Sequence, residues 1–367
     1  MTARDSTAPI DAVSARAYRI PTEQPESDGT VEWTSTTLVV AHVSAGGRRG
    51  FGYTYADPIV AHLIDDKLAT QLKGRDAFAT TECWDAMVGE VRNLGSAGVC
   101  SMAISALDSA LWDLKGKLLN APLVSLLGQA RQRVPVYGSG GFTSYSVAQL
   151  QKQLGDWVAT GLRCVKMKIG RNPEEDVPRV DAVRNAIGAD PEIFVDANGA
   201  YARKFALRQA RALADLGVTW YEEPVSSDDL AGLNSLRDRS PAGMDITAGE
   251  YGYDSVYFRR MCAAGAVDVL QADATRCKGI TGFLRAAAIA DAFMLPLSSH
   301  CAPSLHLHVC CAAPRVRHME YFHDHVRIEH MLLDGALSPA GGEIEPDLGR
   351  PGLGLELKET DAQRFAV

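Results

Sequence analysis

From Val134 onward, short runs of apolar and β-branched residues alternate with longer segments of helical pattern. The segments between the runs are rich in Ala, Leu and Arg, as in ARKFALRQARALADLG (202–217). Successive runs end between 23 and 31 residues apart, at Gly138, Ile169, Asp196, Glu223, Glu250, Asp273, Ser299 and Phe322. Buried parallel strands read as such apolar runs, and each needs a crossover helix to reach the next. Eight repeats therefore predict an α/β fold of the (β/α)₈ barrel type.

The first 130 residues follow a different pattern, which predicts an α+β unit. Residues 36–56 (TTLVVAHVSAGGRRGFGYTYA) read as two strands joined by a turn at Gly46-Gly47. A long helix follows, whose apolar face is formed by Ile104, Leu107, Leu111, Leu114 and Leu118, and which Asn120 and Pro122 should end. We expect this unit to span residues 1–130 and to be completed by the loop-like tail 346–367, with the barrel at 131–345.

Composition narrows the possible partners of the chain. Its 367 residues are 46% hydrophobic and 22% charged, and the formal net charge is −8. An acidic protein is a poor partner for nucleic acid or an anionic membrane, but a local cationic site could still hold a small acid. Residues 1–15 show no signal-peptide pattern, and no apolar run approaches the roughly 18 residues of a membrane span. Eight cysteines without a Cys-x-x-Cys pair indicate reduced thiols and a cytoplasmic location.

Ionisable residues occur where the predicted barrel strands end, which is where barrel enzymes carry their active sites. Asp196, Glu222 and Glu250 end the third, fourth and fifth strands, which are neighbours in a barrel. Three converging carboxylates repel one another unless a cation lies between them. Oxygen ligands favour Mg²⁺, with Mn²⁺ as an alternative. Taken singly, each carboxylate could instead be a surface loop charge.

The second strand carries two lysines, in CVKMKIG (164–170). Alternate residues of a strand point to the same face, so Lys166 and Lys168 should project together. At a separation of roughly 6.6 Å their repulsion is on the order of 2.5 kcal/mol. We therefore expect Lys168 to be partly neutral near pH 8 and able to accept a proton, whereas Lys166 stays charged and holds an anion.

Asp273 and His300 end the sixth and seventh strands, opposite the lysines. A carboxylate beside an imidazole fixes its tautomer and raises its basicity, which suits a general acid or base. The alternative is a histidine with a purely structural role. Asn198 and Glu320, at the third and eighth strand ends, complete the polar set.

The ordered motifs VKMKIG, VDANGAY, YEEP, AGE, QADATRCKGITGF, SSH and HMEYF resemble the mandelate racemase subgroup of the enolase superfamily (the mandelate racemase/muconate lactonizing enzyme family). The segment ISALDSALWDLKGKLLNAPLVSLLG resembles the helix that closes the capping domain of that family. The resemblance spans nearly the whole chain. It implies a (β/α)₇β barrel, similar to a TIM barrel, under an N-terminal α+β capping domain whose loops close over the substrate.

The resemblance also implies residue roles. Asp196, Glu222 and Glu250 would bind Mg²⁺. Lys166 would contact the substrate carboxylate, and Glu320 would hydrogen-bond that carboxylate or its enediolate. Lys168 would act as acid or base on one face of the substrate and His300, oriented by Asp273, on the other. The family also implies a homo-oligomer.

The capping loops depart from the family pattern, so the substrate cannot be inferred from the resemblance. Where the family often has Gly-x-Gly-Glu, this chain reads GFGYTY (50–55). The expected substrate contacts are polar or amphipathic: Lys166, Asn198 and Glu320 from the barrel, with Asp28, Trp33, Tyr53, Tyr55 and His323 around its opening. They favour a polyhydroxy acid, and hence dehydration of an acid sugar to a 2-keto-3-deoxy acid. Racemisation, epimerisation or lactone cycloisomerisation are the alternatives on the same site, and a Schiff-base aldolase is a more distant one.

Overall fold

The computed structural model describes residues 7–367. The first six residues of the predicted capping unit lie outside this range. Eight parallel strands form a closed barrel, because β11 pairs with β10 on one side and with β4 on the other. The strands are β4 (Val134–Gly140), β5 (Cys164–Lys168), β6 (Glu192–Asp196), β7 (Val218–Glu222), β8 (Asp245–Ala248), β9 (Val269–Ala272), β10 (Leu297–Ser299) and β11 (Val316–Phe322).

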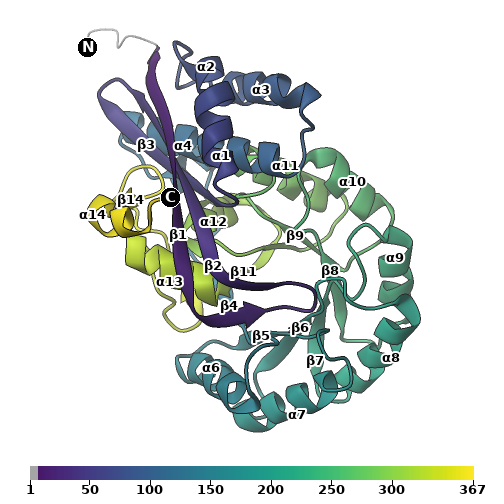
Figure 1. The fold of residues 1–367 in the computed structure, drawn as a ribbon. Helices are drawn as coiled ribbons and strands as arrows, with labels where there is room; N and C mark the ends of the chain where they lie inside the picture. The colour runs from purple at the N-terminus through teal and green to yellow at the C-terminus, as the bar shows by residue number, and fades with distance from the viewer. Residues whose placement is uncertain (1–6) are drawn as a thin grey trace.

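Seven helices connect consecutive barrel strands, which confirms the (β/α)₇β architecture. They are α6 (Val147–Ala159), α7 (Asp176–Ile187), α8 (Arg203–Ala214), α9 (Leu230–Arg239), α10 (Ser255–Ala263), α11 (Gly279–Ala292) and α12 (Pro303–Ala312). An eighth helix, α13 (His323–Leu332), follows β11 directly. In Figure 1 the helices α6 to α11 surround the strands as an outer ring.

The N-terminal part forms the expected capping domain, an antiparallel sheet with helices packed against it. The sheet contains β1 (Ile10–Ser27), β2 (Glu32–Ala45) and β3 (Arg48–Tyr55) in that order. Its helical segments are α1 (Ile59–Leu63), η1 (Ile64–Leu68), α2 (Ala69–Leu72), α3 (Thr80–Glu90), η2 (Val91–Asn93), α4 (Val99–Leu119) and α5 (Leu123–Leu127). The predicted turn and helix are both present: Gly46 and Gly47 join β2 to β3 with positive φ, and Asn120 ends α4 in the left-handed region.

The long strand β1 was not predicted. It lies at the edge of the sheet, where β2 is its partner strand, and Tyr18 also forms an isolated bridge with Ala366. Its sequence, IDAVSARAYRIPTEQPES, mixes charged residues and two prolines with a few apolar ones. Edge strands tolerate proline and polar residues because one side of their backbone needs no partner in the sheet.

The hairpin between β1 and β2 extends from the cap helices toward the barrel strands (Figure 1). Its tip packs directly on the loops that follow β5 and β6. A Cβ at Gly29 would lie 2.5 Å from the carbonyl oxygen of Ala197 and 2.7 Å from that of Ile169. Only glycine permits so close an approach of two backbones, so the cap covers the C-terminal ends of the barrel strands.

The C-terminal tail contacts both parts of the molecule. Its segments are β12 (Leu333–Asp334), β13 (Glu343–Ile344), β14 (Glu356–Leu357), α14 (Glu359–Ala362) and η3 (Gln363–Phe365). β13 pairs with β4 of the barrel, and Val367 donates its backbone N–H to Ala17 in β1. The division of the chain at residues 130 and 345 stays a prediction.

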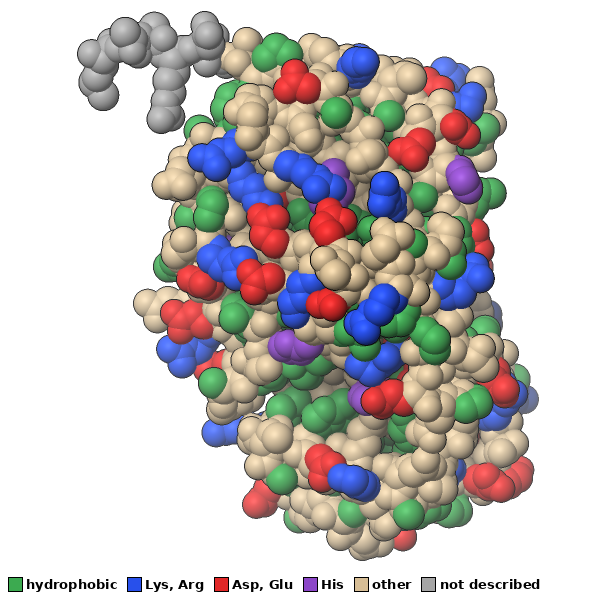
Figure 2. All heavy atoms as spheres, turned by 60° about the vertical axis from the view of Figure 1, so that its left-hand side comes forward, with side chains coloured by type: hydrophobic (Ala, Val, Ile, Leu, Met, Phe, Trp, Pro, Cys, Tyr) green, Lys and Arg blue, Asp and Glu red, His purple; other side chains and the backbone are tan. Residues whose placement is uncertain are grey.

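Acidic and basic side chains are interspersed on the face of the molecule in Figure 2. Within residues 7–367, none of the helices is both long enough and apolar enough to cross a membrane.

Candidate active site

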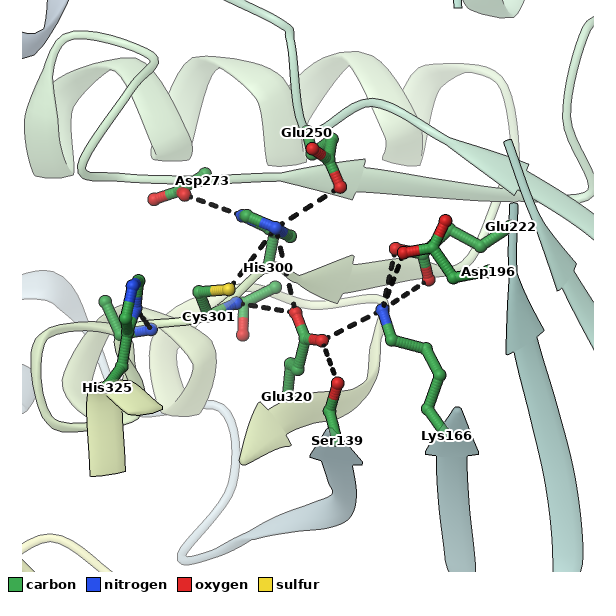
Figure 3. A network of polar contacts seen from close by, with 12 residues as sticks. Ser139, Lys166, Asp196, Glu222, Glu250, Asp273, His300, Cys301, Glu320 and His325 are labelled. Atoms are coloured by element: carbon green, nitrogen blue, oxygen red, sulfur yellow. Dashed lines mark hydrogen bonds and ion pairs between the residues drawn. The ribbon is translucent and has the colours of Figure 1, made fainter. Parts of the chain in front are cut away.

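The polar residues at the strand ends converge inside the mouth of the barrel. Each side chain follows from its position in a strand: Lys166 and Lys168 alternate along β5, while Asp196 and Glu222 end β6 and β7. Glu250, Asp273 and His300 lie one or two residues beyond their strands, and Glu320 lies within β11. All of these residues are buried, with at most 6% of their surface exposed. Figure 3 shows most of them pointing toward one another.

Asp196, Glu222 and Glu250 form a cluster of oxygen donors. Each offers a carboxylate oxygen, and these atoms lie within 4.8 Å of one another. Trp220 Nε1 donates to Glu222 at 2.8 Å, and the backbone N–H of Asn198 donates to Asp196 at 2.9 Å. Burial, reinforced by Asp196, raises the pKa of Glu222 to about 7. A buried trio of this kind can hold a hard divalent cation.

The two lysines differ in their surroundings. Lys166 Nζ lies 2.7 Å from Glu222 and 2.8 Å from Glu320, and this side chain is completely buried (Figure 3). Lys168 forms an ion pair with Asp196 and lines the pocket above the barrel.

The expectation of a partly neutral Lys168 near pH 8 is wrong for this arrangement. Burial has the largest single effect and lowers the pKa of Lys168, but the combined attraction of Asp196, Glu250 and Glu222 outweighs burial and the repulsion from Lys166, so this pKa lies above its ordinary value. The prediction from the sequence lowered the pKa of Lys168 mainly through its repulsion from Lys166. It gave too little weight to the carboxylate that pairs with Lys168.

His300 and Asp273 form the expected pair. His300 Nδ1 donates to Asp273 Oδ2 at 2.8 Å, while Thr275 donates to the other oxygen of Asp273 through its N–H and its hydroxyl, both at 2.7 Å. Burial has the largest single effect and raises the pKa of Asp273, but the hydrogen bond to His300 and the attraction of His300, His306 and Arg276 together lower that pKa to about 2. The tautomer fixed in this way leaves His300 Nε2 for other partners. It lies 3.3 Å from Glu250 Oε2 and 3.3 Å from Cys301 Sγ.

A pocket of about 710 Å³ lies between the cap and the barrel mouth. Its barrel side includes Lys168, Asn198, Glu250, Tyr251, Asp273, Arg276, His300, Cys301 and His325. Its cap side includes Asp28, Val31, Trp33, Ser35, Thr36, Thr37, Tyr55 and Asp57. Lys168 and His300 come from β5 and from the end of β10, so the two groups able to move protons face this pocket from well-separated strands.

The predicted substrate contacts divide into three groups. Asp28, Trp33, Tyr55 and Asn198 line the pocket. Lys166 and Glu320 lie beneath the pocket, where Lys166 forms ion pairs with both Glu320 and Glu222. Tyr53 and His323 do not line it.

Two expected pocket residues are directed elsewhere by their own packing. The hydroxyl of Tyr53 donates to Glu329 at 2.8 Å in a fully buried position behind Tyr55. His323 lies near Glu23 and packs its ring edge-on against Phe142. Its place at the pocket is taken by His325, whose ring stacks on that of Tyr55 at 3.4 Å between centroids.

Three residues in contact with the site were not predicted from the sequence. Arg276 donates to Glu250 Oε1 at 3.2 Å, and Ser139 Oγ donates to Glu320 at 2.5 Å. Cys301 follows His300 directly and donates its backbone N–H to Glu320 at 2.8 Å. Their position in the sequence could have indicated them. Each of the three residues lies within a barrel strand or shortly after one, close to a residue that was predicted to belong to the site.

Comparison with known proteins places the whole chain in one family. A model described as the mandelate racemase/muconate lactonizing enzyme N-terminal domain matches residues 15–128. A second model, described as enolase C-terminal domain-like, matches residues 149–361.

Two relatives illustrate the range of named activities. The chain is 34% identical to the 3,6-anhydro-alpha-L-galactonate cycloisomerase of Streptomyces coelicolor, over 98% of this chain and 99% of the relative. It is 31% identical to the L-talarate/galactarate dehydratase of Salmonella typhimurium, over 88% of this chain and 83% of the relative.

Solved structures share the fold. A mandelate racemase/muconate lactonizing enzyme-like protein from Rubrobacter xylanophilus has 50% identity and a TM-score of 0.96, with 98% of this chain and 100% of that chain covered. A racemase from Streptomyces coelicolor has 34% identity and a TM-score of 0.92, with 98% and 100% covered, and its structure contains bound magnesium. Magnesium is thus present in a neighbouring structure, and this chain has a carboxylate cluster able to hold it.

Proposed function

The chain belongs to the mandelate racemase/muconate lactonizing enzyme family of the enolase superfamily, and from this premise we propose that it dehydrates an acid sugar to a 2-keto-3-deoxy acid. The first step is abstraction of the proton α to the substrate carboxylate, with Mg²⁺ as cofactor. The observation that carries the proposal is the pocket itself. Lys168 and His300 face it from separate strands, with the carboxylate cluster and Lys166 at its floor.

Asp196, Glu222 and Glu250 would hold the magnesium ion. Besides their proximity, one atom supports this fit: within residues 7–367, the buried Glu250 Oε2 accepts no hydrogen bond and has only an ion-pair contact of 3.3 Å with His300 Nε2. A bound Mg²⁺ acts as a Lewis acid that stabilises negative charge on the substrate carboxylate.

Lys166 and Glu320 would hold the reacting carboxylate from below. Loss of the α-proton turns the carboxylate into an enediolate with two negative charges. Lys166 is a fixed cation whose pKa stays well above its ordinary value, because the attraction of Glu222 and Glu320 outweighs the effect of burial. It can therefore stabilise the second charge without moving.

Lys168 and His300 would move the protons. One of them, in its neutral form, takes the α-proton on its face of the substrate. For Lys168 this requires prior loss of the proton that its ion pair with Asp196 retains. The other donates a proton to the β-hydroxyl, which then leaves as water. The enol that remains becomes the 2-keto-3-deoxy acid.

The capping side of the pocket supports a polyhydroxy substrate. Ser35 and Thr37 offer hydroxyls at the pocket wall, whereas the hydroxyl of Thr36 donates to Asp324, and Asp28 and Asp57 add carboxylates. These groups match the hydrogen-bonding needs of sugar hydroxyls. An aryl substrate would leave them unpaired.

Cycloisomerisation is the second candidate. One relative with this activity, named above, matches 98% of this chain at 34% identity. The same site performs it if the second group protonates carbon or a ring oxygen in place of a leaving hydroxyl.

The test is a screen of acid sugars and their lactones with Mg²⁺ in D₂O, followed by proton NMR. Dehydration gives a 2-keto-3-deoxy acid, whereas racemisation gives an α-deuterated epimer and cycloisomerisation turns a lactone into an isomer without loss of water. Glu222→Gln should abolish turnover and Mg²⁺ binding. Glu192→Gln, at the start of β6 and thus at the opposite end of the barrel, is the matched control and should retain both. Full activity of Glu222→Gln would overturn the metal assignment.

Self-association and a cytoplasmic location complete the proposal. The eight cysteines, all within the described residues, are free thiols, which supports a reducing compartment. Light scattering on the purified chain measures its oligomeric state.

A further inference from the structure

We propose that His300, Cys301 and Glu320 form a second metal site, which takes a thiophilic divalent ion such as Zn²⁺ and thereby blocks proton transfer by His300. The inhibitory consequence rests on the function proposed above. The site itself rests on three side chains whose donor atoms are already assembled.

The three donors are close enough to share one ion. His300 Nε2 lies 3.3 Å from Cys301 Sγ and 4.0 Å from Glu320 Oε2, and one ligand atom from each residue lies within 4.8 Å of the others. Zinc bonds of about 2.0 Å to nitrogen and about 2.3 Å to sulfur put those two atoms roughly 3.5 Å apart in a tetrahedral site. Within residues 7–367, the only other such cluster is the carboxylate trio.

The backbone brings the imidazole and the thiol to the same side. Successive residues of an extended strand point to opposite faces, which would separate His300 from Cys301. Here Cys301 and Ala302 have φ values of 50° and 40°, so the chain turns sharply after β10. Left-handed conformations are unfavourable for residues with a Cβ and tend to persist where function requires them.

Neighbouring residues orient these donor atoms through hydrogen bonds, as in other metal sites. His300 donates its Nδ1–H to Asp273 at 2.8 Å, the hydrogen bond that orients most metal-binding histidines. Glu320 Oε1 accepts from Ser139 at 2.5 Å and lies 2.8 Å from Lys166. Within residues 7–367, Glu320 Oε2 accepts one hydrogen bond, from the backbone N–H of Cys301, and it points toward His300 Nε2 at 4.0 Å (Figure 3). A carboxylate oxygen has two lone pairs, so one is left for a metal ion.

Donor chemistry separates this site from the magnesium site. Three carboxylates suit a hard ion, whereas a thiolate with an imidazole and one carboxylate suits Zn²⁺ or Co²⁺. His300 and Cys301 both line the 710 Å³ pocket, so an ion can enter by the substrate's route. Binding would release the thiol proton of Cys301 and occupy the lone pair of His300 Nε2. The imidazole could then neither accept nor donate a proton.

Cobalt reports on the site without substrate, because a cobalt–thiolate bond absorbs in the near ultraviolet. The full chain, saturated with Mg²⁺, is titrated with Co²⁺ and then with Zn²⁺. We expect a thiolate band that Zn²⁺ displaces. Cys301→Ser should abolish the band and weaken Zn²⁺ binding at least tenfold. Cys164→Ser, at the opposite end of the barrel, should retain both. A thiolate band that survives in Cys301→Ser, or Co²⁺ binding to the native chain without such a band, would overturn the proposal.

A second measurement separates this proposal from the proposed function. With a substrate from the acid-sugar screen, Zn²⁺ should inhibit the native chain at concentrations at least tenfold below those that inhibit Cys301→Ser, each relative to its own rate with Mg²⁺. Equal sensitivity of the two proteins would contradict the inhibitory role. Because the cobalt band needs no turnover, it can appear even if no acid sugar reacts, in which case the proposed function fails and the metal site stands.

Discussion

Trp220 connects the apolar interior of the barrel to the carboxylates proposed to bind magnesium. Its ring stacks on Phe194 at 5.1 Å, and its Nε1 donates to Glu222 at 2.8 Å. Groups that orient a metal ligand in this way typically contribute a factor of 10 to 100 in metal affinity. The position of a carboxylate oxygen of Glu222 therefore depends on the packing of Trp220 against Phe194.

Trp220→Phe keeps most of this packing and removes the hydrogen bond. We expect Mg²⁺ affinity to fall by about 10- to 100-fold with the fold intact, measured by calorimetric titration. Trp112→Phe is the control, since its Nε1 donates to Thr281 Oγ1 at 2.9 Å outside the site. Equal Mg²⁺ affinities of the two variants would contradict the role of Trp220.

Lys168 and His300 can be assigned separately as base and acid. The variant that lacks the base, either Lys168→Met or His300→Asn, should lose both α-proton exchange and dehydration by about 10²- to 10⁴-fold. The variant that lacks the acid should lose dehydration but keep exchange in D₂O. Proton NMR follows both reactions in one sample. Dehydration at the native rate in either variant would exclude that residue from the reaction.

For single residues, the sequence predicted which side chains of the regular strands point into the barrel mouth, including Lys166, Asp196 and Glu222. Alternation and strand ends define where such side chains point. Tyr53 and His323 were misplaced because their orientation depends on long-range partners: Glu329 for Tyr53, and Phe142 for His323. Cys301 was missed because an extended backbone would have turned it away from His300.

The β1–β2 hairpin is the element that forms the cap side of the pocket. It contains a buried carboxyl, Glu26, which accepts from Trp33 Nε1 at 3.0 Å. Burial, with a contribution from the nearby Asp324, raises the pKa of Glu26 to about 8. The folded hairpin therefore keeps a proton that the unfolded chain has already released at neutral pH.

Glu26→Gln should stabilise the protein in a pH-dependent way. From about pH 4.5 to about pH 8, native Glu26 lowers the free energy of unfolding as pH rises, because the folded state binds more protons than the unfolded state. A tenfold difference in proton affinity is worth about 1.4 kcal/mol. The melting temperature of the variant relative to the native protein should thus rise across this window and level off above it. The exposed Glu32→Gln is the control, and a difference that does not change with pH would contradict the protonated state.

Helices, strands and turns were predicted where their own residues favour one backbone conformation. The turn at Gly46-Gly47 and the end of α4 at Asn120 depend on local backbone preferences, and both are present. Strand β1 has no clear strand pattern in its own sequence, which contains Pro21 and Pro25. It is extended because it pairs with β2, and that pairing cannot be read from the residues of β1 alone.

In the molecule as a whole, Asp113 joins three segments far apart in the sequence. This buried carboxylate of α4 accepts the backbone N–H of Phe51 in β3 and that of Leu353 in the tail, both at 2.7 Å. It also lies 2.9 Å from Lys117 Nζ. No pattern in the sequence indicates a contact between residues 113 and 353, so the attachment of the tail at this point is a property of the folded chain alone.

Asp113→Ala should destabilise the whole molecule. The change leaves two buried N–H groups without an acceptor, each worth about 1–3 kcal/mol. We expect a loss of about 3 kcal/mol or more, seen as a lower melting temperature in calorimetry. Asp156→Ala removes an exposed ion pair with Lys152 on α6 and should cost less than about 1 kcal/mol. Similar losses in the two variants would contradict the role of Asp113.

The contact at Gly29 has a consequence for engineering new substrate preferences. The hairpin tip touches backbone carbonyls of the barrel, so Gly29 cannot gain a side chain without lifting the cap. In the following segment, residues 31–37, the pocket is lined by Val31, Trp33, Ser35, Thr36 and Thr37. None of these residues is proposed to move protons. A library confined to that segment would vary the substrate while leaving the catalytic apparatus untouched.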